Sequence, residues 1–265
     1  MTTAQIASIA LTAVLILVVF FTCETTSPEI REATAQRVPA AMDATDLTGL
    51  LMDAKDSLTT NQASELVLLE RQLQDVPEGD TLARTAALKK LSGKWYEIGN
   101  YAIAGTYARQ VAELEETPRA YAIAGTTLTI CVQRAPDEKM KAYCNKYAEQ
   151  AFQSAISLAP DDLTHRTNLA LLYADNPPAD NPMKGILQLL ELNKQAPDNV
   201  SILVNLARLG TQTGQYDKAA GRLERALALE PNNLRANCLL AEVYTQLQRS
   251  EEAAAYGQRC QSLLQ

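Results

Sequence analysis

The sequence predicts an all-α protein built from antiparallel helix pairs that repeat along the chain. Its 265 residues are 47% hydrophobic, yet only three are Phe and one is Trp. Ala, Leu, Glu and Gln are abundant, and this composition favours helix. No long alternating run of β-branched and aromatic residues is present from which a sheet would be built.

Three prolines set the repeat length. Pro160, Pro197 and Pro231 each follow an amphipathic helical run and begin a turn of the form Pro-Asp/Asn-Asp/Asn. Because proline cannot continue a helix, each one marks a helix end. The prolines lie 37 and 34 residues apart, and a period near 34 is typical of a solenoid of two-helix repeats.

The first segment, residues 1–23, is expected to be a membrane anchor. It carries no charge, and its apolar stretch is about the minimum length that spans a bilayer as a helix, so residues 6–23 are expected to contact lipid. No Lys or Arg precedes Arg31, and bulky Phe20 and Phe21 stand before Cys23, which is a poor match to a cleaved secretory peptide. An uncleaved anchor is therefore preferred, with cleavage or lipidation at Cys23 as the alternative.

Residues 24–45 are expected to form a flexible linker, because they are rich in Thr, Ala, Pro and Glu and lack a helical period. Only Arg31 and Arg37 contribute to the positive-inside rule, so the sequence near the anchor does not determine the membrane orientation. Residues 46–80 place apolar side chains at three- and four-residue spacings, which predicts a helical hairpin that caps the solenoid.

Five helix pairs are expected to follow over residues 81–265. The predicted units are about 81–117, 118–162, 163–199, 200–233 and 234–265. The third unit has a Pro-rich insertion before its second helix. The last unit lacks a closing proline, as expected of a terminal capping unit.

The fourth unit carries a recognisable pattern of large and small residues at fixed offsets. The residues on this pattern are Leu203, Leu206, Ala207, Ala219, Leu223, Ala226 and Pro231, with Gly214 and Tyr216 opening the second helix. The unit closely resembles the tetratricopeptide repeat (TPR) family, although Gly210 stands where an aromatic residue is usual. The resemblance implies a right-handed superhelical solenoid over residues 81–265, and the chain as a whole resembles membrane-anchored bacterial TPR proteins.

The hexapeptide YAIAGT occurs twice, at residues 101–106 and 121–126, but twenty residues is not the repeat length. The first copy is expected to open a second helix and the second copy to lie inside a first helix, with Gly125 at the close helix contact. We therefore expect Gly125→Leu to disturb packing more than Gly105→Leu does.

No catalytic or cofactor-binding pattern is recognised. The single histidine, His165, is expected at the surface at the start of a first helix. No Gly-rich phosphate loop, His-rich metal pair or Cys-x-x-Cys motif is present. The net charge of -7 also argues against nucleic-acid binding. We predict no enzyme activity, with no catalytic residue, cofactor or metal site.

Four cysteines fall on two predicted hairpins, Cys131 with Cys144 and Cys238 with Cys260. Within each hairpin the two residues are nearly level with one another across the turn, which permits a disulfide. Two disulfides suit an oxidising compartment outside the inner membrane. The alternative is that each cysteine serves as a small apolar residue at a tight helix contact.

The resemblance further implies a peptide-binding concave face lined by the first helix of each repeat. Asn168 and Asn205 precede the core Leu of their units, where Asn amides of the family hold a peptide backbone. Arg208 and Arg235 lie nearby on the same inferred face, and such a row suits a carboxylate or acidic peptide.

These features predict a non-enzymatic scaffold or adaptor that binds a protein or peptide partner through the solenoid. The expected location is the inner membrane, with a single membrane span and the solenoid on the periplasmic side. The alternatives are a structural spacer that self-associates into oligomers, and an accessory subunit that regulates a membrane enzyme.

Overall fold

The structure is a computed structural model that describes residues 44–265. The predicted anchor, residues 1–23, and almost all of the predicted linker lie outside the described residues. Contacts divide the chain after Gly49, and the unit from Leu50 to Gln265 contains the helix pairs. Within the described part, no helix is long and apolar enough to cross a membrane.

All regular secondary structure in residues 44–265 is α-helical, which confirms the all-α part of the predicted fold class. The helices are α3 (Ala44–Asp56), α4 (Thr60–Gln74), α5 (Thr81–Ile98), α6 (Tyr101–Glu115), α7 (Pro118–Arg134), α8 (Glu138–Leu158), α9 (Leu163–Asp175), α10 (Lys184–Gln195), α11 (Val200–Gln212), α12 (Tyr216–Leu229), α13 (Leu234–Gln246) and α14 (Ser250–Leu263).

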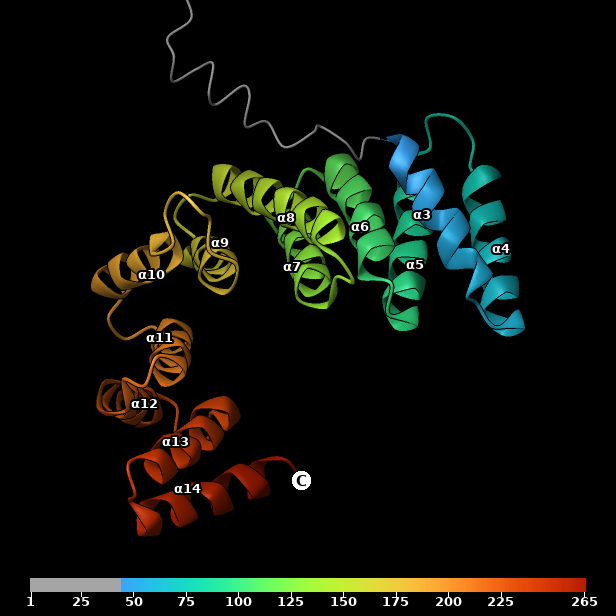
Figure 1. Cartoon of the computed structure of the whole chain (residues 1–265). Helices are drawn as coiled ribbons and strands as arrows, with labels where there is room; N and C mark the ends of the chain where they lie inside the picture. Colours follow the sequence, from blue (N-terminus) through green and yellow to red (C-terminus); the bar gives the residue numbers. More distant parts are fainter. Residues whose placement is uncertain (1–43) are drawn as a thin grey trace, which may run out of the picture. The chain divides into compact units, whose positions relative to one another are not determined.

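The helices from α5 onward form five antiparallel pairs, and each pair packs on the next in chain order (Figure 1). One pair falls within each predicted unit: α5 with α6, α7 with α8, α9 with α10, α11 with α12, and α13 with α14. The first helices of these pairs are α5, α7, α9, α11 and α13. Ahead of them, α3 and α4 occupy the region predicted as a hairpin, and α4 packs on α5.

The proline turns do more than end helices, because their last residue caps the helix that follows. Asp162, Asn199 and Asn233 each stand two positions after a turn proline, and each side chain accepts a hydrogen bond from a backbone N–H in the first turn of α9, α11 or α13. Such N-caps satisfy amides that would otherwise lack a partner at the start of the helix. The same short sequence therefore stops one pair and starts the next.

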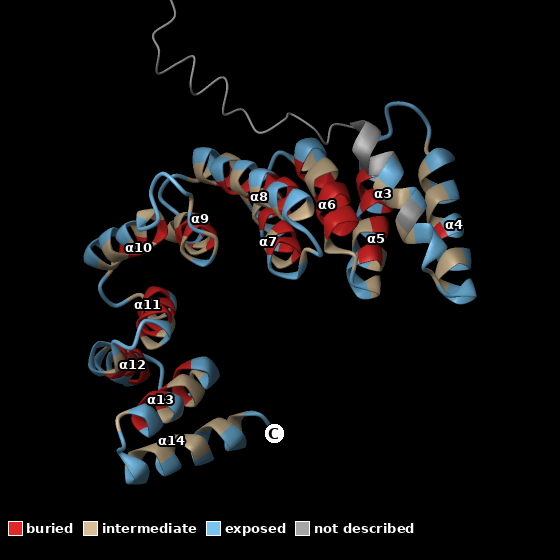
Figure 2. Cartoon of the chain, in the orientation of Figure 1, coloured by how far each residue is buried: buried red, intermediate tan, exposed pale blue. Residues whose placement is uncertain are grey.

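Small residues allow the paired helices to approach closely. Alanines with no exposed surface lie on most of the helices from α6 to α13, and the buried positions run along the faces where helices meet (Figure 2). Gly185 of α10 is the tightest such contact, since a Cβ there would collide with the backbone of Ala170 and Ala174 in α9. By contrast, α14 has no fully buried residue.

The two YAIAGT copies lie in consecutive helices, α6 and α7, in the places predicted for them. A Cβ on Gly105 would lie 2.6 Å from the side chain of Leu128 in α7, and one on Gly125 would lie 2.6 Å from the ring of Phe152 in α8. Both glycines are thus close contacts with the next helix. The equal distances do not support the expectation that Gly125→Leu disturbs packing more than Gly105→Leu does, because α6 packs between α5 and α7 and is buried on both sides.

Candidate functional site

The four residues predicted for peptide binding line one cavity, which we name the Asn–Arg groove. It has a volume of about 370 Å³ and is built mainly by the first helices α7, α9, α11 and α13. Its lining residues are Thr126, Thr129, Ile130, Gln133, Phe152, Asn168, Leu171, Asp175, Asn205, Arg208 and Arg235. Helix stacking therefore brings Asn168, Asn205, Arg208 and Arg235 together, although 67 residues of sequence separate the first from the last.

Arg208 of α11 is held by a carboxylate from the preceding pair. Its Nη2 donates to both carboxylate oxygens of Asp175 in α9, at 2.9 and 3.1 Å. Its Nη1 lies 3.5 Å from Oε1 of Gln212, one turn later in α11. The guanidinium is therefore fixed in the groove beside an acceptor of its own chain.

Arg235, the second residue of α13, supplies a cation that is not paired within the described part of the chain. Partial desolvation lowers the pKa of its guanidinium, and the positive charge of Arg208 lowers it further, while Asp175 opposes that effect. Two arginines and one carboxylate line the groove, which leaves it with an excess positive charge.

Asn168 and Asn205 are each the sixth residue of their helix, on α9 and α11. Asn205 is only 5% exposed, and its amide nitrogen donates to the backbone oxygen of Ser201 at 2.8 Å. Asn168 is half-buried and makes no hydrogen bond with the described residues. The side-chain amide of Asn168 is thus available to a ligand, whereas that of Asn205 is partly engaged by its own helix.

Sequence reasoning missed Asp175, which is the counter-ion of the groove. It precedes Arg208 by 33 residues, close to one repeat, and it therefore lies on the neighbouring first helix. A search for opposite charges one period apart would have found this pair. The groove residues of α7, Thr126, Thr129 and Gln133, were also not predicted, because the long second unit obscures the register of α7.

The prediction that His165 lies at the surface is wrong, because the residue is only 6% exposed. It shares a helical stripe with Leu169 and Leu172, which are buried where α9 packs. Its Nε2 lies 3.5 Å from Oδ2 of Asp162, the N-cap of the same helix, and its Nδ1 has no partner in the described part of the chain.

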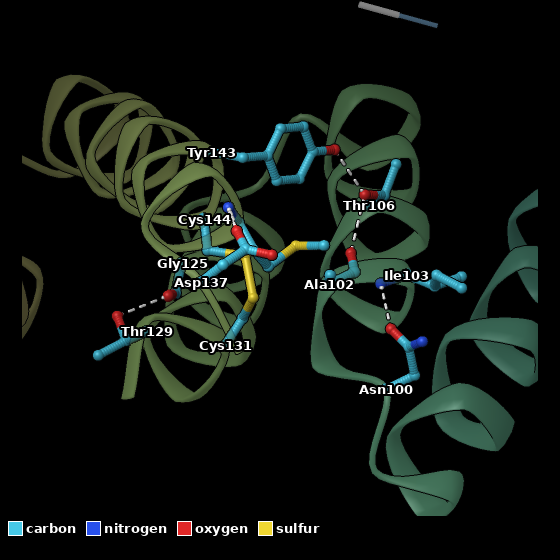
Figure 3. Close-up of a disulfide and its surroundings, with 11 residues drawn as sticks. Asn100, Ala102, Ile103, Thr106, Gly125, Thr129, Cys131, Asp137, Tyr143 and Cys144 are labelled. Atoms are coloured by element: carbon cyan, nitrogen blue, oxygen red, sulfur yellow. Dashed lines mark hydrogen bonds between the residues drawn. A yellow bond between two sulfur atoms is a disulfide. The ribbon is translucent and has the colours of Figure 1, made fainter. Parts of the chain in front are cut away.

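Both cysteine pairs are bonded in the structure. Cys131 of α7 is joined to Cys144 of α8, with their Cα atoms 5.9 Å apart, and Cys238 of α13 to Cys260 of α14, with their Cα atoms 4.9 Å apart. Each bond links the two helices of one pair. Figure 3 shows the first bond between α7 and α8, beside the hydrogen bond of 2.9 Å between Tyr143 and Thr106 of α6.

Metal binding has no support among the described residues, where no cluster of three or more His, Cys, Asp or Glu side chains is suited to an ion. The chemistry present in the Asn–Arg groove is amide hydrogen bonding and fixed positive charge. Groups of these kinds are suited to hydrogen-bonding a carboxylate or a peptide backbone.

Part of the chain matches a known repeat family. Residues 211–256, from the end of α11 into α14, match the tetratricopeptide repeat family. A TPR repeat-containing protein of Treponema pallidum (strain Nichols) is 33% identical over 120 residues, which are 45% of this chain but only 14% of that protein.

Two solved structures are also similar. MamA residues 41 to the end, from Desulfovibrio magneticus RS-1, covers 71% of this chain and 97% of its own, at 15% identity and a TM-score of 0.45. YrrB, described as a TPR protein with an unusual peptide-binding site, covers 67% of this chain and 84% of its own, at 13% identity and a TM-score of 0.39. The repeat match and the helix pairs that contain it show that the chain contains the tetratricopeptide repeat.

Proposed function

We propose that this protein is a non-enzymatic scaffold that binds an acidic peptide segment of a partner protein in the Asn–Arg groove. The observation that carries the proposal is the convergence of Asn168, Arg208 and Arg235 from three successive first helices on one cavity. Arginine pairs well with carboxylates, and asparagine amides satisfy a peptide backbone.

The charge distribution supports an acidic ligand. The chain has a net charge of -7, yet the charged residues that line the groove are two arginines and one aspartate. A positive groove on an acidic protein disfavours basic and neutral partners and favours a carboxylate-bearing one. A partner carboxylate is expected to pair with Arg235 and to compete with Asp175 for Arg208.

The proposal includes attachment to the bacterial inner membrane, with the solenoid in the periplasm. The uncharged residues 1–23 and the two disulfide-bonded helix pairs support this location. Protease added to intact spheroplasts should degrade the solenoid. Degradation only after the inner membrane is permeabilised would place the solenoid in the cytoplasm and contradict this part of the proposal.

The binding proposal is tested with the detergent-solubilised full chain and a fluorescein-labelled peptide of Asp-Ser repeats. Fluorescence anisotropy should show salt-sensitive binding that is lost in the Arg208→Gln/Arg235→Gln variant. Arg225→Gln is the matched control, because Arg225 pairs with Asp198 and does not line the groove. Equal affinity of all three proteins for the peptide would show that the groove is not the binding site.

Partner capture and oligomeric state then separate a scaffold from a self-associating spacer. Crosslinking in native membranes should recover a partner with the parent protein and not with the groove variant. Light scattering of the purified chain that showed only stable homo-oligomers, with identical crosslinks for both proteins, would favour the spacer.

A further inference from the structure

A second cavity lies between the first helices α5 and α7, and we name it the Gly93 groove. It has a volume of about 500 Å³. Its floor consists of Ala108 and Val111 of α6, which are buried. Its walls carry two large apolar side chains that face solvent, Tyr96 of α5 at 45% exposure and Ile123 of α7 at 52%. Such a groove can bury a large apolar side chain of a ligand.

Gly93, which lines this groove, is not needed by the fold. It lies in the interior of α5, where glycine is less favourable than alanine. A Cβ at Gly93 would have no other atom of the described chain within 4 Å, apart from its own stretch of helix. Gly105 and Gly125 differ, because Leu128 and Phe152 occupy the space that their Cβ would need. The open space over Gly93 is therefore suited to the backbone of a ligand.

The rim of the Gly93 groove has an excess positive charge. Lys89 of α5 pairs with Glu115 of α6 at 2.5 Å. Arg119 of α7 also lines the groove and forms no ion pair with the described residues. The groove thus offers one uncompensated cation beside an apolar floor, a combination that is complementary to an apolar side chain next to a carboxylate.

We propose that the Gly93 groove binds a peptide segment in which a large aliphatic residue adjoins an acidic residue. The aliphatic side chain lies on Ala108 and Val111 between Tyr96 and Ile123, the peptide backbone crosses Gly93, and the acidic side chain pairs with Arg119. The inference rests on the proposed function in taking a partner peptide as the occupant. Apart from α7, it involves different helices from the Asn–Arg groove, so the two sites can be tested separately.

The test uses the detergent-solubilised full chain and three fluorescein-labelled peptides, made of Asp-Leu, Asp-Ser and Asn-Leu repeats. The Asp-Leu peptide should bind about tenfold more tightly than each of the others, because only it presents both groups. Gly93→Ala should weaken Asp-Leu binding by about tenfold, since its methyl group occupies the place of the peptide backbone. Anisotropy measures each affinity.

The melting temperature of Gly93→Ala is a second measurement, and it separates a glycine kept for ligand binding from one that the fold requires. Alanine is the better helix former, so the melting temperature should rise by about 2–4 °C while the affinity falls. Gly221→Ala is the matched control. Gly221 is an exposed glycine inside α12 with no neighbour within 4 Å, and it lines neither groove. It should raise the melting temperature similarly and leave binding unchanged.

Unchanged Asp-Leu affinity in Gly93→Ala, equal binding of Asp-Leu and Asp-Ser, or no binding of any probe would each overturn the inference. Loss of Asp-Ser binding in Arg208→Gln/Arg235→Gln, with no effect of Gly93→Ala on Asp-Leu, would retain the proposed function and reject this second site. Weaker Asp-Leu binding in Gly93→Ala, with unchanged Asp-Ser binding in Arg208→Gln/Arg235→Gln, would reject the Asn–Arg groove and retain the Gly93 groove.

Discussion

Arg208 donates from one nitrogen to both carboxylate oxygens of Asp175, at 2.9 and 3.1 Å, across the boundary between two repeats. The side chains of both residues are about a quarter exposed. The pair therefore joins α9 to α11. It also engages the Arg208 guanidinium, with which a ligand carboxylate would pair. An acidic ligand of the Asn–Arg groove must compete with Asp175.

We therefore expect Asp175→Asn to raise the affinity for the Asp-Ser peptide. The substitution frees Arg208 from its ion pair and removes a negative charge that repels the peptide. For an ion pair of this exposure, the affinity measured by anisotropy titration should rise by up to about fivefold. Asp198→Asn is the control, because it breaks a similar pair with Arg225 outside the groove. A decrease in affinity with Asp175→Asn would mean that Asp175 positions Arg208 for the ligand.

The four solenoid cysteines should be unreactive before reduction. Denatured protein treated with an alkylating reagent should show no modification at Cys131, Cys144, Cys238 or Cys260 by mass spectrometry, and full modification after a reductant. Both cysteine pairs form disulfides in the structure. Four reactive thiols in the untreated, denatured protein would show that the cysteines serve as small core residues instead.

The terminal disulfide should matter most for α14. This helix has no fully buried residue and packs on the core only through partly buried side chains such as Ala253 and Tyr256, so the bond from Cys260 to Cys238 reinforces a shallow contact with α13. Cys238→Ser/Cys260→Ser should speed amide exchange in α14, with a local loss of roughly 3 kcal/mol. Cys131→Ser/Cys144→Ser, which breaks a bond between well-buried helices, should instead lower the melting temperature of the surrounding pairs. Unchanged exchange in α14 would contradict this role.

Gly105→Ala and Gly125→Ala should both destabilise the protein, by about 1–3 kcal/mol each in denaturant unfolding. The added methyl group would lie 2.6 Å from Leu128 in one case and from Phe152 in the other. Gly221→Ala, whose methyl group meets no neighbour, should stabilise slightly. A neutral effect at either buried glycine would show that the neighbouring helix moves away at little cost.

Alkaline pH should destabilise the fold through Tyr107 of α6. Burial raises the pKa of its phenol to about 12, with a further contribution from the negative charge of Glu70. The folded state therefore holds this proton more tightly than the unfolded state, in which tyrosine titrates near pH 10. Stability should be complete below about pH 10 and fall by roughly 2 kcal/mol as the pH approaches 12.

Tyr107→Phe should remove this loss, as measured by urea unfolding at pH 9 and at pH 11.5. Its stability near neutral pH should remain close to that of the parent, because the described residues give the Tyr107 hydroxyl no hydrogen-bond partner that the variant would lose. If the parent and Tyr107→Phe lost the same unfolding free energy between pH 9 and pH 11.5, the alkaline destabilisation would come from groups other than Tyr107.

The sequence by itself determined the helices and their spacing. Pro160, Pro197 and Pro231 stop helices because proline lacks an N–H, and the Asp or Asn two positions later caps the next one. Both rules act over a few residues, so they can be read without knowledge of the fold. The placement of Asn168, Asn205, Arg208 and Arg235 on equivalent helices followed from the same period.

Only the tertiary structure decided which side chains meet. The packing of α9 against its neighbours buries His165, and that of α6 between α5 and α7 makes Gly105 as tightly packed as Gly125. The pairing of Arg208 with Asp175 and the open space over Gly93 likewise depend on the rotation of one helix pair against the next. That rotation results from the packing of many side chains at once, and no local stretch of sequence specifies it.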